Sequence, residues 1–244
     1  MMENRSFDHF LGWLPGADGR PAGLRYPDKN GTLHPTHHLA PDFQGCGFAD
    51  PDHSFEGGRV EYDNGKCDGW LRAGSNDEYS IGYYTRPDLA FLGQVAPKFA
   101  TPDRYFSAIM GPTFPNRIFQ HAAQTDRLSN TLAISTLPTI WDSLAQSGHT
   151  GKYYFSDLPV LALWGTKYAS ISQPVSTFFT DAAAGNLPAV AYVDPRFVGE
   201  EQGLSNDNRP HADIRNGEAF LDSIYRAVTN GPGCHMPCST TPRS

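Results

Sequence analysis

The first residues of the chain carry side chains that could hold a metal ion. Residues 3–8 read ENRSFD, so the carboxylate of Glu3 and the amide of Asn4 stand side by side. Oxygen ligands of this kind suit a hard divalent cation. We therefore expect Glu3 and Asn4 to bind a divalent metal ion, whose identity the sequence does not set.

A second motif, GPTFPNR over residues 111–117, could supply a nucleophile. Thr113 stands between a predicted strand and the start of a helix, where free backbone N–H groups favour a phosphate group. A metal ion bound there would lower the pKa of the hydroxyl and activate it. Asn116 and Arg117 could then hold phosphoryl oxygens, the arginine in a forked geometry. In the alternative interpretation, Thr113 only caps the helix.

Both motifs, in this order, resemble those of the phosphoesterase family that includes nonspecific phospholipase C and related acid phosphatases. That family carries Met-Glu-Asn-Arg-Ser-Phe-Asp and, later, Gly-Pro-Thr-x-Pro-Asn-Arg, as this chain does. The resemblance implies that Thr113 is the nucleophile and that Thr113, Glu3 and Asn4 are ligands of a divalent metal ion. It also implies hydrolysis of a phosphate ester. The substrate would be a phospholipid or another phosphomonoester or diester, and the sequence does not choose between them.

Two histidines become candidates through the same resemblance. His53, followed by the NGKCDGW stretch at 64–70, matches a histidine-containing segment of the family. It would contact phosphate or protonate a leaving oxygen, whereas a solvated loop histidine is the plain alternative. Residues 206–210 resemble the family's Asn-Asp-Asp-His-Pro segment, but Arg209 stands where the family typically has His. His211, two residues later, is the candidate substitute for binding substrate.

The elements that would position these residues alternate between strand and helix. Residues 13–88 are rich in Gly, Pro, Asp and Asn and predict loops with short elements. Apolar spacing further on predicts helices at 88–100, 115–124, 139–147, 175–184 and 213–228, and strands at 104–110, 151–155 and 188–193. This alternation favours an α/β fold with a mostly parallel sheet. The resemblance implies an alkaline-phosphatase-like version of it, with helices on both faces.

Composition excludes some classes of protein. The chain has 244 residues and a formal charge of -7, which argues against a general nucleic-acid binder. It contains no run of about 18 apolar residues, so we expect no transmembrane segment. No basic and apolar leader opens the chain, so we expect no signal peptide in it. Cellular location and oligomeric state stay open.

The family's later Asp-Glu-x-Gly-Gly motif, which supplies further metal-binding acids, does not occur in this sequence. We therefore expect residues 1–230 to be the N-terminal part of a phosphoesterase domain, truncated at both ends, and residues 231–244 to be a disordered tail. A catalytically inactive fragment or binding module is the first alternative function. A sulfatase-like hydrolase is the second, and Thr113 argues against it because such enzymes need Cys or Ser at that position.

The four cysteines give weaker signals. Cys46 and Cys67 flank a Gly-rich segment, and the sequence leaves open whether they form a disulfide. Cys234 and Cys238 surround a histidine, but a second pair of ligands is missing. We interpret that stretch as an ordinary tail rather than a zinc site.

Overall fold

The computed structural model, which describes residues 1–20 and 22–232, has a parallel three-stranded sheet at its centre. Strand β5 (Gly151–Phe155) pairs in parallel with β6 (Ser172–Pro174) and with β7 (Val190–Val193), in the order β6-β5-β7. Tyr153 and Tyr154 on β5 are both fully buried, because helices cover both faces of a parallel sheet. The predicted α/β class is confirmed.

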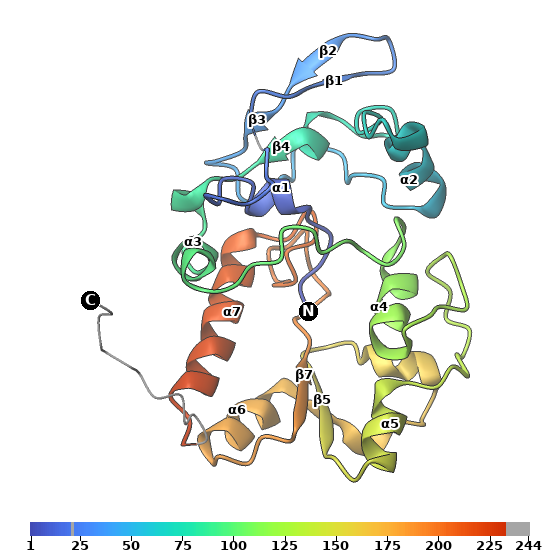
Figure 1. Cartoon of the computed structure of the whole chain (residues 1–244), viewed down its shortest axis with the longest axis vertical. Coiled ribbons are helices and arrows are strands. Elements are labelled where there is room, and N and C mark those ends of the chain that lie inside the picture. The colour runs from blue at the N-terminus through green and yellow to red at the C-terminus, as the bar shows by residue number, and fades with distance from the viewer. Residues whose placement is uncertain (21, 233–244) are drawn as a thin grey trace.

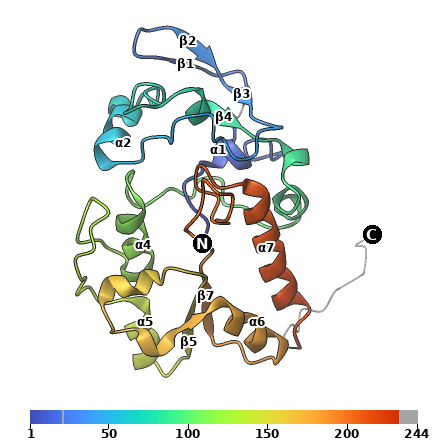
Figure 2. The same cartoon turned by 180° about the vertical axis from the view of Figure 1, so that it is seen from behind.

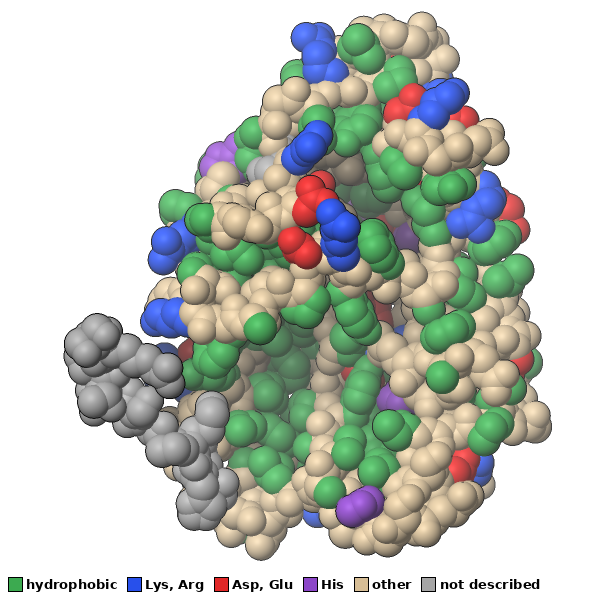
Figure 3. Space-filling view, in the orientation of Figure 1, with side chains coloured by type: hydrophobic (Ala, Val, Ile, Leu, Met, Phe, Trp, Pro, Cys, Tyr) green, Lys and Arg blue, Asp and Glu red, His purple; other side chains and the backbone are tan. Residues whose placement is uncertain are grey.

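Helices α4 (Thr113–Ala122), α5 (Ile140–Gln146), α6 (Val175–Ala183) and α7 (Ile214–Thr229) flank this sheet. Helices α4 and α5 lie on one side of β5 and β7, and α6 and α7 lie on the other (Figures 1 and 2). Ile118, Trp141, Tyr153 and Trp164 form the centre of the core on the α4 side. Over α6, α7 and β7, hydrophobic side chains gather in a hollowed part of the surface (Figure 3).

The N-terminal part is built from short elements, as its composition predicts. Strands β1 (Arg25–Pro27) and β2 (Leu33–Pro35) are antiparallel, whereas β3 (His37–His38) and β4 (Gly82–Tyr83) are parallel. Helices α1 (Phe7–Phe10), α2 (Phe55–Tyr62) and α3 (Leu92–Val95) are short. The 3₁₀ turns of this part are η1 (Asp63–Gly65), η2 (Glu78–Ile81), η3 (Arg86–Asp88) and η4 (Ala96–Lys98). Two others, η5 (Val160–Trp164) and η6 (Ala169–Ile171), lie between β5 and β6 in the sequence.

A second hydrophobic cluster fastens this part to the rest of the molecule. Its buried members are Phe10, Leu39, Tyr79, Tyr84, Leu89 and Ile214. Ile214 is the first residue of α7, so the cluster joins the C-terminal helix to the N-terminal elements. Hydrogen bonds from Glu3 and Arg5 to the carbonyl oxygens of Asp207 and Asn208 hold the start of the chain against the loop that precedes α7.

Two sequence predictions about elements need correction. The predicted strand at 104–110 is a loop, and Tyr105 and Phe106 are 72% and 80% exposed. A short apolar run does not distinguish a buried strand from an exposed loop. The predicted helix at 88–100 is shorter and divided: α3 covers Leu92–Val95, and η4, with Pro97 in its first turn, follows it directly.

Asp213 is the N-cap of α7 and accepts a hydrogen bond from the backbone N–H of Arg215, as predicted. Cys46 and Cys67 are unbonded and exposed. Cys234, Cys238 and the predicted tail from 233 onward lie outside the described residues. Within residues 1–20 and 22–232, no helix is both long enough and apolar enough to cross a membrane.

Helix α2 contains a buried acid that makes the stability of the fold depend on pH. Glu61 is 8% exposed, and its Oε1 accepts a hydrogen bond of 3.2 Å from Asn76 Nδ2. Burial raises the pKa of the Glu61 carboxyl to about 7, although the hydrogen bond from Asn76 acts in the opposite direction. The folded protein therefore keeps this carboxyl protonated at a pH where the unfolded chain ionises it.

We expect Glu61→Gln to stabilise the protein at about pH 8 relative to wild type. The folded wild-type carboxyl binds more protons than the unfolded one between pH 4.5 and about 7. Wild-type stability therefore falls as pH rises through that window, by roughly 2–3 kcal/mol from this group. Urea unfolding at both ends of the window measures the effect. A difference between variant and wild type that does not change with pH would contradict the prediction.

Candidate active site

The structure brings the two ends of the candidate site together. Thr113 is the first residue of α4, and its Oγ1 lies 3.5 Å from Glu3 Oε2, although the two residues are 110 positions apart. The backbone N–H of Glu3 donates to the carbonyl oxygen of Asp207 at 2.8 Å. Asn4 follows with an exposed side chain and a φ of 51°. Glu3 and Thr113 thus face each other, and Asn4 stands at the surface beside them.

Arg117, one turn after Thr113, is buried and holds Glu3 in place. Its Nε donates to Glu3 Oε1 at 2.8 Å, and its Nη1 donates to Asp194 Oδ1 at 2.6 Å. Its Nη2 donates to the carbonyl oxygen of Met1 at 2.9 Å. Burial alone would lower the pKa of Arg117, but the carboxylates of Asp194 and Glu3 outweigh it and raise that pKa. Each guanidinium nitrogen thus has a protein partner, and Arg117 holds Glu3 in position. The predicted contact of Arg117 with phosphoryl oxygens stays a prediction.

Asp194 completes this arrangement from the carboxyl end of β7. Its side chain is fully buried, and its Oδ2 accepts a hydrogen bond of 2.7 Å from the hydroxyl of Tyr153 on β5. Its backbone N–H donates to the carbonyl oxygen of Tyr154 at 2.8 Å, which continues the β5–β7 pairing by one residue. Sequence reasoning missed Asp194 as a site residue, although an acid directly after a parallel strand is a usable signal.

Asn116 organises the loop before Thr113. Its Nδ2 donates to the carbonyl oxygens of Ile109, Gly111 and Pro112 at 2.9, 3.1 and 3.0 Å. Its Oδ1 accepts from the N–H of Ile109 at 3.0 Å. Both ends of the amide are therefore occupied within residues 109–112. In the structure, Asn116 fixes the conformation of the loop that leads to Thr113. The predicted role of Asn116 in binding substrate stays a prediction.

The loop that precedes α7 places further polar groups beside Glu3. Asp207 is fully buried, and its Oδ2 has no hydrogen-bond partner among the described residues. Burial, and then the nearby charge of Glu3, raise the pKa of the Asp207 carboxyl to about 7. A Cβ at Gly217 would lie 1.8 Å from Asn208 Oδ1, so only glycine lets this loop pack against α7.

Arg209 and His211, the two residues compared in the sequence, lie in different surroundings. Arg209 forms an ion pair with Glu200. The Nε2 of His211 is buried and has no hydrogen-bond partner within the described part of the chain. Of the two, His211 is therefore the side chain with a buried, unpartnered polar atom among the described residues.

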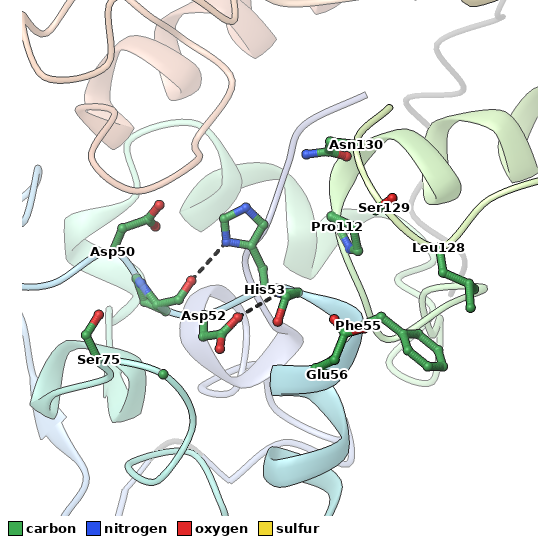
Figure 4. A pocket seen from close by; sticks show the side chains of 13 residues that line it. Asp50, Asp52, His53, Phe55, Glu56, Ser75, Pro112, Leu128, Ser129 and Asn130 are labelled. Carbon is green, nitrogen blue, oxygen red and sulfur yellow. Dashed lines mark hydrogen bonds between the residues drawn. The ribbon is translucent and has the colours of Figure 1, made fainter. Parts of the chain in front are cut away.

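His53 lines a pocket of about 430 Å³ next to the start of α4. Its Nδ1 lies 2.9 Å from the carbonyl oxygen of Pro51, to which it can donate, and this contact leaves Nε2 free (Figure 4). Pro112 and Asn130 line the same pocket, and Asn130 Oδ1 accepts from the N–H of Phe114 at 2.8 Å. The pocket therefore borders the first turn of α4, and the His53 ring points into it.

The oxygen atoms near Glu3 fit part of a metal-binding shell. Glu3 Oε2, Thr113 Oγ1 and the unpartnered Asp207 Oδ2 are the hard ligands that a divalent cation prefers. Residues 1–20 and 22–232 contain no group of three or more His, Cys, Asp or Glu side chains placed to hold a metal ion. The described residues thus offer two acids and a hydroxyl, and further ligands would have to complete the shell.

Comparison with known proteins identifies the family. The model of the phosphoesterase family matches residues 1–236, and the chain belongs to that family. It is similar to non-specific phospholipase C6 of Arabidopsis thaliana, with 30% identity over 95% of this chain and 49% of the relative. Non-specific phospholipase C1 of the same plant is 24% identical over 95% of this chain and 48% of its own.

A bacterial relative gives the same result. The non-hemolytic phospholipase C of Pseudomonas aeruginosa is 28% identical over 84% of this chain and 36% of the relative. The resemblance inferred from the two motifs is therefore confirmed. The chain spans about half the length, or less, of the curated relatives it matches.

Proposed function

We propose that this chain carries the nucleophile side of a phosphoric ester hydrolase site. The observation that carries the proposal is the contact between Thr113 Oγ1 and Glu3 Oε2 at the first turn of α4, with Glu3 fixed by the buried Arg117. Membership of the phosphoesterase family supports it. The names of the relatives, which are phospholipases C, favour a phospholipid phosphodiester over a small phosphomonoester.

In this proposal the hydroxyl of Thr113 attacks phosphorus, and the bond from phosphorus to the leaving oxygen breaks. Glu3 Oε2 lies where it can accept the hydroxyl hydrogen, and the N-terminal turn of α4 presents a positive dipole end to the phosphoryl oxygens. His53, in its doubly protonated form, would give the proton on its Nε2 to the leaving oxygen. Water then hydrolyses the phosphothreonine and returns Thr113.

A divalent cation held by Glu3, Asn4 and Thr113 would lower the pKa of the hydroxyl and offset the negative charge of the phosphoryl group. Asp207 is a further ligand in this proposal, because its Oδ2 is buried near Glu3 without a hydrogen bond. Arg117 and Asp194 keep Glu3 in one orientation and touch neither substrate nor metal.

An inactive, phosphoester-binding module is the second candidate function. The incomplete set of metal-ligating side chains in the described residues favours it. The two functions are separated by assaying the purified chain on p-nitrophenyl phosphate and on phosphatidylcholine with a panel of divalent metals. Metal-dependent release of product supports the hydrolase. Absence of release with every metal rejects it for this chain and leaves the binding module.

We expect Glu3→Gln to weaken binding of divalent metal about tenfold or more, because an oriented carboxylate ligand is lost. Calorimetric titration with Mn²⁺ and Mg²⁺ measures the affinity without any need for turnover. Asp222→Asn is the matched control, since Asp222 lies on α7 in an exposed pair with Arg226. Equal metal affinity in wild type, Glu3→Gln and Asp222→Asn would remove Glu3 as a ligand.

A further inference from the structure

Arg5 is an enclosed guanidinium with a free donor. Its Cζ lies 5.4 Å from the ring centroid of Tyr79 and 5.8 Å from that of Phe10. Its Nε donates to the carbonyl oxygen of Asn208 at 2.6 Å, and its Nη1 donates to the hydroxyl of Tyr79 at 2.9 Å. Nη1 also lies 2.9 Å from His9 Nε2. Its Nη2 is buried and has no hydrogen-bond partner among the described residues.

The guanidinium groups of Arg5 and Arg117 have different neighbours. Arg117 lies against two carboxylates, those of Glu3 and Asp194. Within residues 1–20 and 22–232, no carboxylate forms an ion pair with Arg5. A guanidinium keeps its positive charge in proteins, and enclosing it without an anion is unfavourable. The position of Arg5 therefore calls for an anion that the described part of the chain does not supply.

His211 offers a second free nitrogen against the same aromatic ring. Its ring centroid is 6.2 Å from that of Tyr79, the ring on which Arg5 stacks, and its Nε2 is buried without a partner in the described residues. The loop that carries His211 also contacts Arg5 through the carbonyl of Asn208. Arg5 and His211 thus form one cluster with two unused nitrogen atoms.

This cluster lies next to the proposed nucleophile. Glu3, two residues before Arg5, contacts both Thr113 Oγ1 and the carbonyl of Asp207, which belongs to the same loop as His211. Arg5 and His211 are thus linked to Thr113 through Glu3 and the loop that precedes α7. A phosphoryl group matches them, because guanidinium donors pair well with phosphate oxygens.

We propose that Arg5 and His211 form the anion-binding part of the site and hold the non-bridging oxygens of a phosphoryl group. The proposal rests on the proposed function and gives Arg5 the phosphate contact that the sequence motif suggests for Arg117. The recognised chemistry is the phosphate oxyanion, whether it belongs to free phosphate or to a phosphodiester.

The test is calorimetric titration of the metal-free chain with two probes, inorganic phosphate and glycerophosphocholine. We expect the wild-type chain to bind phosphate. For each probe that the wild-type chain binds, Arg5→Gln and His211→Gln should lower the affinity about tenfold or more, as expected for a lost charged hydrogen bond. Binding of phosphate alone assigns the site to the free anion, and binding of both assigns it to phosphodiesters as well. Arg215→Gln is the control, because Arg215 stacks on Phe43 but is paired with Asp213.

Folding is checked separately, because Arg5→Gln also loses its stacking on Tyr79. Arg5→Lys keeps the charge without the fork and should bind phosphate more weakly than wild type while melting near the wild-type temperature. In addition, the Arg5 Nε–Hε signal of the wild-type chain should shift on phosphate titration, and that of Arg117 should not. No phosphate binding by wild type, or equal affinity in wild type, Arg5→Lys and Arg5→Gln, overturns the proposal.

Different experimental results would reject the anion site and the proposed hydrolase function. Arg5-dependent phosphate binding by a chain that never releases product upholds the anion site and rejects the hydrolase. Thr113-dependent turnover, together with phosphate affinity that ignores Arg5 and His211, upholds the hydrolase and rejects the anion site.

Discussion

Arg117→Met is expected to lower the free energy of unfolding by about 3–5 kcal/mol, because it leaves buried carboxylates without their cation. The Arg117 and Glu3 side chains are 3% and 6% exposed, and that of Asp194 is fully buried. Removing the guanidinium breaks the bonds to both acids and to the carbonyl of Met1. Equilibrium unfolding in urea near neutral pH measures the loss.

The matched control is Arg226→Met. Arg226 pairs with Asp222 at 2.7 Å on the exposed side of α7, where solvent screens the pair. We expect this variant to unfold at nearly the wild-type urea concentration. A loss of less than about 1 kcal/mol for Arg117→Met would contradict the burial argument, because an unpaired buried charge should cost more than that.

The fold class could be predicted because it depends on local patterns, and the sequence motifs also provided candidate residues for the site. Helix α7 and strand β5 follow from apolar spacing, which reports which face of an element is buried. The two motifs identified Glu3 and Thr113, and the fold brings these residues to 3.5 Å. A motif records which side chains lie near one another in the sequence. For Glu3 and Thr113, the residue types and the predicted helix start were enough to suggest metal binding and nucleophilic attack.

The partners of those side chains could not be predicted, because they come from distant parts of the chain. Arg117 has the residue type and motif position of a phosphate ligand, but Asp194, 77 residues later, occupies its Nη1. Arg5 lies inside the first motif but has no role in the sequence analysis, since only the structure shows that its Nη2 lacks a partner among the described residues. Which of two arginines is neutralised is decided by tertiary packing, and neither composition nor spacing records it.

Thr113→Ala is expected to lower kcat for phosphate ester hydrolysis by about 10³-fold or more, because removing a nucleophile removes the covalent route. The fold should remain, since Thr113 is only partly buried and Pro112, not Thr113, is the N-cap of α4. Its contact with Glu3 is long, at 3.5 Å, so its loss should cost no more than about 1 kcal/mol of stability. Steady-state kinetics and thermal melting of the same preparations measure both effects.

Thr113→Ser distinguishes two roles of the Thr113 hydroxyl, that of a nucleophile and that of a group that only stabilises the first turn of α4. Serine keeps the attacking oxygen, so it should retain far more turnover than alanine and still form a phosphorylated residue at position 113. Mass spectrometry of the acid-quenched reaction should find that phosphoryl group in wild type and Thr113→Ser and not in Thr113→Ala. If Thr113→Ala retained most of the wild-type kcat with unchanged melting, Thr113 would belong to the structure of α4, and the attacking group would have to be sought elsewhere around Glu3.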